Sequence, residues 1–71
     1  MTIGQSIKKA RKSRKLTQIE LACEARISPQ TISLWECDKM MPTLDLLICV
    51  ANVLKIGLDE LVGRNRNGER R

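Results

Sequence analysis

The twenty residues "TQIELACEARISPQTISLWE", residues 17–36, decide the fold of this chain. Thr17 is followed three positions later by Glu20, which is the pattern of a capping box at the start of a helix. Ser28 can cap a second helix, and Pro29 suits the first helical position because its fixed φ angle is helical and its missing N–H is not needed there. The stretch therefore predicts two short helices joined by a tight turn.

Small and apolar residues within this stretch have the spacing that two crossing helices need. The first helix is predicted to end near Ala25 and the second to cover residues 29–37. Ala22 is small enough for the helices to approach each other, and Ile27 lies in the turn, where it can point into the core. The apolar positions of the stretch are Leu21, Ala25, Ile27, Ile32 and Trp35.

The rest of the chain predicts further helices and no strand, because the alternation of period two is absent. Residues 38–42 are predicted to form a loop. Residues 64–71 contain only Gly, Asn and charged residues and are predicted to be a disordered basic tail after a domain of residues 1–63. Three more helices are predicted: residues 3–15, with Ile3, Ile7 and Ala10 on one stripe; residues 43–54, capped by Thr43 and apolar over most of the circumference; and residues 57–63. The fold class is therefore all-α with five short helices.

The positive charge of the chain lies at its two ends. The net charge is +5 over 71 residues. Residues 8–15 hold six Lys or Arg and no acid, and residues 64–71 hold four Arg and one Glu, whereas residues 16–63 carry a net charge of −4 from three basic and seven acidic residues. This distribution favours an anionic partner, nucleic acid before membrane, although a solvated basic helix face with a charged tail is the alternative.

Three segments together carry a resemblance to a known family. They are "IKKARKSRKLTQIELA", "ISPQTISLWE" and "PTLDLLICVANVLKIGLDELV". Over about residues 3–62 the chain resembles the lambda-repressor-like (Cro and xenobiotic-response-element type) helix-turn-helix DNA-binding family. The resemblance implies a compact five-helix domain whose second and third helices form the helix-turn-helix. Arg26 and Asp38 stand where the family usually has glycine, and a left-handed backbone at such residues costs roughly 1–2 kcal/mol.

The resemblance implies that the third helix enters the DNA major groove. Gln30 can bond adenine bidentately, and Leu34 can contact a thymine methyl group. An exposed Leu34 is otherwise an ordinary isolated surface residue. The residues expected to read bases are Pro29, Gln30, Thr31, Ser33 and Leu34.

Other residues are implied to contact the DNA backbone or to support the reading helix. Arg11 and Glu36 are expected to form a partly buried ion pair between the first and third helices. The start of the second helix has free backbone amides that favour a phosphate. The expected phosphate contacts are Gln18, Ser28, Lys39, Met40, Arg14 and Lys15.

The expected function is a sequence-specific double-stranded DNA-binding transcriptional regulator, a repressor that acts as a homodimer on a palindromic operator. The expected dimer surface is Val53, Leu58, Leu61 and Val62, for which a place in the intramolecular core is the alternative. A protein-interaction module or an antitoxin-type partner with the same fold is the alternative function. No catalytic arrangement of residues is present, so an enzyme is not expected.

Cysteine usage and targeting signals complete the expectations. The three cysteines have no CxxC spacing and no histidine accompanies them, so neither a metal site nor a cofactor is expected. Cys23 and Cys49 are interpreted as small apolar core residues, whereas Cys37 is expected to be exposed. No signal peptide, membrane span or small-molecule effector is indicated, and the predicted location is the cytoplasm of a bacterial host.

Overall fold

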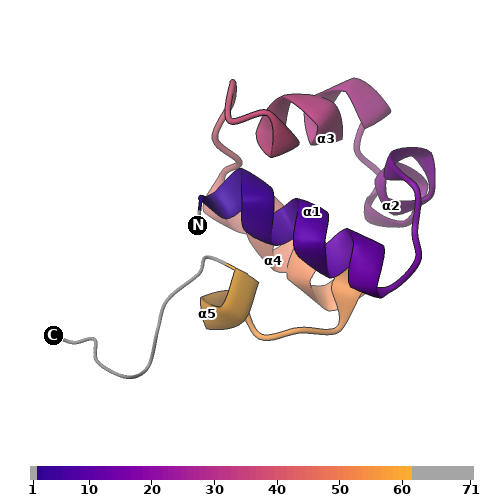
Figure 1. Ribbon diagram of the computed structural model, residues 1–71, viewed down its shortest axis with the longest axis vertical. Helices are drawn as coiled ribbons and strands as arrows, with labels where there is room; N and C mark the ends of the chain where they lie inside the picture. The colour runs from indigo at the N-terminus through magenta and orange to yellow at the C-terminus, as the bar shows by residue number, and fades with distance from the viewer. Residues whose placement is uncertain (1, 62–71) are drawn as a thin grey trace, which may run out of the picture.

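Five helices form the protein in the computed structural model, which describes residues 2–61. They are α1 (Ile3–Ser13), α2 (Gln18–Ala25), α3 (Pro29–Glu36), α4 (Leu44–Leu54) and α5 (Leu58–Leu61). Figure 1 shows α1 crossing the middle of the molecule, with α3 above it, α2 at one end and α5 below. Contacts join α3 to α1 and α2, and α5 to α1 and α4. Residues 2–61 contain no strand, as predicted.

Hydroxyl side chains begin the first four helices. Thr2, Thr17, Ser28 and Thr43 each accept a hydrogen bond from the backbone N–H three residues later. Thr17 forms the predicted capping box, because Glu20 also accepts from the Thr17 N–H at 2.8 Å. These caps satisfy donors that the first helical turn leaves unpaired, so the sequence fixes each helix start locally.

A left-handed residue follows each of the first four helices. Lys15, Arg26, Asp38 and Lys55 have φ angles of 59–61°. After α2, the Ile27 N–H donates to the Ala22 carbonyl at 2.9 Å, which is the 6→1 hydrogen bond of a Schellman motif. Lys15 is the left-handed residue that follows α1, and this helix ends at Ser13. The predicted helix over residues 3–15 is therefore two residues too long.

All five helices contribute side chains to the core. Ile32 is fully buried and Trp35 is 1% exposed, so these two side chains anchor α3. Ala22 is 1% exposed, in agreement with its predicted place at the helix crossing, and Ile27 packs against the core from the turn. The buried apolar residues are Ile7, Leu21, Ala22, Ile32, Trp35, Leu47, Val50, Ala51, Leu54 and Leu61.

Leu61 corrects one prediction, because it is fully buried within the chain and therefore is not part of a dimer surface. The α4–α5 connection returns α5 against α1 and α4, so this side chain completes the intramolecular core. Val53 and Leu58 are half-buried and pack against that core, and Val62 lies outside the described residues. The predicted tail at residues 64–71 also lies outside them.

The interpretation of Cys23 and Cys49 as core residues is wrong, because both are exposed. In α4 the buried positions are Leu47, Val50, Ala51 and Leu54, and Cys49 lies on a different side of the helix. A helix that is apolar over most of its circumference does not indicate from its sequence which side faces the core. Cys37 is exposed as predicted.

Candidate nucleic-acid interface

Helix α3 has one buried side and one accessible side. Its buried side consists of Ile32 and Trp35. On the accessible side Gln30 is exposed, and Leu34, one helical turn further on, is 36% exposed. The remaining predicted base-reading residues are Pro29, which is exposed, and Thr31 and Ser33, which are half-buried. This accessible side is uncharged and ends in an apolar side chain, a composition that suits contact with base edges.

Two hydroxyl groups meet at the start of α3. The Thr31 N–H donates to Ser28 Oγ at 3.1 Å, and the two hydroxyl oxygens are 2.9 Å apart. Each hydroxyl keeps further hydrogen-bonding capacity, because a hydroxyl is both a donor and an acceptor. The two predicted contact residues are therefore held together at the exposed end of the helix.

The predicted ion pair between α1 and α3 is present and nearly buried. Arg11 Nε donates to Glu36 Oε2 at 2.8 Å and Arg11 Nη2 donates to Glu36 Oε1 at 3.1 Å. The Arg11 side chain is 9% exposed and that of Glu36 is 4% exposed. Arg11 Nη1 also donates to the Leu16 carbonyl at 2.8 Å. The pair therefore joins α1, the α1–α2 connection and the end of α3.

Gln18, the first residue of α2, belongs to the same network. Its Nε2 atom donates to Glu36 Oε1 at 2.9 Å. This hydrogen bond is not apparent from the sequence, because the two residues are 18 positions apart and no local pattern relates them. The polar head of Gln18 is consequently fixed against the end of α3.

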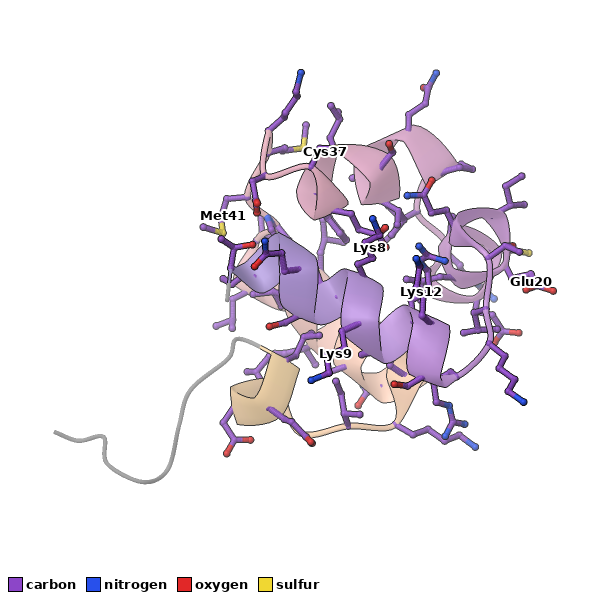
Figure 2. The ribbon with its side chains drawn as sticks, in the orientation of Figure 1. Lys8, Lys9, Lys12, Glu20, Cys37 and Met41 are labelled. Atoms are coloured by element: carbon purple, nitrogen blue, oxygen red, sulfur yellow. The ribbon has the colours of Figure 1, made fainter. Side chains whose placement is uncertain are left out.

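Cationic residues surround the helix-turn-helix on more than one side. Lys15 and Lys39 are exposed, at the end of α1 and in the α3–α4 loop, and Met40 is exposed beside Lys39. Figure 2 shows Lys8 and Lys12 together on one side of α1 and Lys9 on the side toward α5. Arg14 lines grooves with residues of the α4–α5 connection, such as Ile56.

Exposed apolar side chains continue from the α3–α4 loop onto α4. Met41, Leu44 and Ile48 are 69%, 61% and 42% exposed. Leu44 and Ile48 are four residues apart on α4, so they lie on one side of the helix. This surface was not predicted from the sequence, in which the α4 residue expected at a surface contact is Val53, nearer the end of the helix.

Residues 2–61 contain neither a candidate metal site nor a helix that could span a membrane. No group of three or more His, Cys, Asp or Glu in this part of the chain could hold a metal ion. No helix of the same part is long and apolar enough to cross a membrane.

Comparison with known proteins places this geometry in a family. The helix-turn-helix family model matches residues 7–61. The immunity repressor protein of Bacillus phage phi105 is 44% identical over 63 residues, which are 89% of this chain and 44% of that protein. The cryptic phage CTXphi transcriptional repressor RstR of Vibrio cholerae serotype O1 is 34% identical over 90% of this chain and 57% of its own length.

The chain thus spans about half the length of these two relatives. Among solved structures, the P22 c2 repressor protein in complex with synthetic operator 9T is similar with a TM-score of 0.84 and 26% sequence identity. This similarity covers 92% of our chain and 98% of that one. The agreement in sequence family, in relatives and in fold shows that this protein belongs to the lambda-repressor-like helix-turn-helix family.

Proposed function

We propose that this protein is a sequence-specific DNA-binding transcriptional regulator that represses transcription by occupying its operator. The observation that carries the proposal is the two-sided construction of α3, which has fully buried anchors and an accessible, uncharged outer side. The relatives named as repressors, and the similarity to a repressor solved on a synthetic operator, support the same function. The proposal is a binding function, carried out on DNA inside a bacterial cell.

Base recognition is assigned to the accessible side of α3. Gln30 presents a carboxamide that can bond adenine N6 and N7 together, and Leu34 can contact a thymine methyl group. Because both side chains come from one side of a helix whose other side is fully buried, they can enter a groove without unfolding the domain. The remaining contacts of this side are Pro29, Thr31 and Ser33.

Backbone contacts are assigned to residues around this helix. Lys39 and Lys15 are exposed cations that can neutralise phosphates. Backbone N–H groups of the loop near Met40, beside Lys39, can donate to a phosphate. Gln18 and Ser28 stand at the first turns of α2 and α3, where unpaired N–H groups favour a phosphate. Arg14, which lines a groove beside the α4–α5 connection, completes this set.

We further propose that two copies bind a palindromic operator, with half-sites about 34 Å apart. Val53 and Leu58 remain candidates for the contact between copies, since they are only half-buried. The exposed Met41, Leu44 and Ile48 form a separate apolar surface that a second copy can cover. Such a contact sets the distance between two α3 helices.

A protein-interaction module is the second candidate function, and the same exposed residues of α4 favour it. Selection of bound duplexes from a random DNA pool, followed by sedimentation of the complex, distinguishes the two candidates. Enrichment of a palindromic sequence bound by two copies is the result expected of the repressor. No enrichment by the folded protein would contradict this proposal and favour the interaction module.

A further inference from the structure

The Glu36 carboxylate collects three hydrogen bonds from two other parts of the chain. Two come from Arg11 in α1, and the third comes from Gln18 at the start of α2, which donates through Nε2 at 2.9 Å. Glu36 itself is the last residue of α3, and its side chain is 4% exposed. One nearly buried carboxylate therefore connects the first turn of α2 to the end of the helix assigned to base reading.

An ionised carboxylate only accepts hydrogen bonds, so it selects one orientation of the Gln18 carboxamide. The NH₂ group must point toward Glu36, and one of its two N–H bonds remains for another acceptor. The Gln18 and Ile19 N–H groups belong to the same first turn, where no intrahelical acceptor exists. The side chain and the helix start together present donors, which is the arrangement that a phosphate oxygen requires.

We propose that Glu36 is a positioning residue for DNA binding, which holds the Gln18 carboxamide with its free N–H ready for a backbone phosphate. The inference rests on the proposed function, in which the start of α2 meets the DNA backbone. Because the Gln18 side chain is ordered before DNA arrives, binding does not have to immobilise it, and this preorganisation increases affinity. Glu36 thus also fixes the register between the phosphate contact of α2 and the base contacts of α3.

The test replaces the ion pair without leaving a buried charge unpaired. The variant Arg11→Met/Glu36→Met has apolar side chains of similar length, and such replacements are often neutral or stabilising. Gln18 then has no acceptor in this network. We expect the operator Kd, measured on the selected duplex, to rise about two- to tenfold, which is the cost of ordering one side chain. The melting temperature is expected to equal or exceed that of the parent.

The Gln18→Ala substitution, introduced into the parent and into Arg11→Met/Glu36→Met, gives the matched comparison. If Glu36 acts through Gln18, the loss caused by Gln18→Ala is smaller in the double variant, because the two changes then remove the same advantage. The dependence of log Kd on log salt is expected to stay unchanged, since Gln18 carries no charge. A lost Arg11–phosphate contact would instead reduce that slope by about one.

A measurement on the unaltered protein covers the case in which the double variant does not fold. The Gln18 side-chain NH₂ is expected to be rigid in ¹⁵N relaxation of the free protein, whereas the exposed Gln30 NH₂ is mobile. Equal mobility of the two groups overturns the proposal, as does a folded double variant with parental operator affinity. Unchanged affinity of Gln18→Ala with an intact consensus overturns only this inference. Selection of no sequence at all overturns the proposed function together with it.

Discussion

Gly4 in α1 lies against the backbone carbonyl oxygen of Trp35 in the last turn of α3. A Cβ atom at Gly4 would overlap this oxygen and lie 2.6 Å from Asp38 Oδ1. The Thr2 hydroxyl also donates to Asp38 Oδ2 at 3.1 Å, so the start of α1 is held against the end of α3. This contact fixes the angle of α3 on the domain, because the obstructing atom belongs to the backbone.

We expect Gly4→Ala to destabilise the domain by about 1–3 kcal/mol, since an extra methyl group forces two packed backbones apart. Urea unfolding of parent and variant measures this difference. Gly57→Ala is the matched control, because a Cβ there meets only the Asp59 side chain. The reduced freedom of the unfolded chain stabilises both variants alike, so a similar loss at both positions would show that the Trp35 contact does not explain the effect.

Ser6→Ala is expected to stabilise the protein. Ser6 Oγ is buried and has no hydrogen-bond partner among the described residues. Burying this hydroxyl without a hydrogen bond costs about 1–3 kcal/mol, and the substitution removes that cost. Thermal unfolding followed by circular dichroism checks the prediction. Ser13→Ala, at an exposed position of the same helix, reports the gain in helix propensity alone. Equal gains at the two sites would contradict the account of Ser6.

Arg26→Gly is expected to leave stability unchanged or to raise it by up to about 1 kcal/mol. Arg26 adopts φ 60° and ψ 44°, and glycine relieves the cost of this left-handed conformation. Greater freedom of the unfolded chain offsets part of the gain. Glu24→Gly, two residues earlier within α2, has no such strain to relieve and is expected to cost about 1 kcal/mol in chemical denaturation. If both variants lose the same stability, the turn carries no strain.

The sequence predicts the helix starts and the helix-turn-helix core well, because both depend on local chemistry. The Thr17, Ser28 and Thr43 caps lie within three residues of the groups that they satisfy. Ile32 and Trp35 are three residues apart on a helix whose other side is polar except for Leu34, so their burial follows from spacing.

Features that depend on distant segments could not be predicted in this way. Lys15 and Lys55 take left-handed conformations without the glycine that normally indicates them. The Gln18–Glu36 hydrogen bond joins two helices and exists only after α3 has packed against α2. The exposure of Cys49 depends on the rotation of α4, which its nearly continuous apolar sequence leaves undetermined.

Lys39→Ala is expected to weaken binding to all duplexes by a similar factor. Lys39 is an exposed cation just after α3, and in the proposed complex its loss removes a phosphate contact and not a base contact. The slope of log Kd against log salt is expected to fall by about 0.9. Lys9→Ala is the control, because Lys9 lies on the side of α1 toward α5 (Figure 2). An equal change of slope for Lys9→Ala would show that net charge alone matters.

The central claim, that the accessible side of α3 reads base edges, is tested most directly by selecting bound duplexes with three proteins in parallel. These are the parent, Gln30→Ala and Leu34→Ala, two changes at accessible positions that leave the buried side of α3 intact. We predict that each variant loses preference at its own base pair in every half-site, by about 1–3 kcal/mol, and retains the rest of the consensus. Identical consensus sequences and identical preferences from all three proteins would contradict the claim.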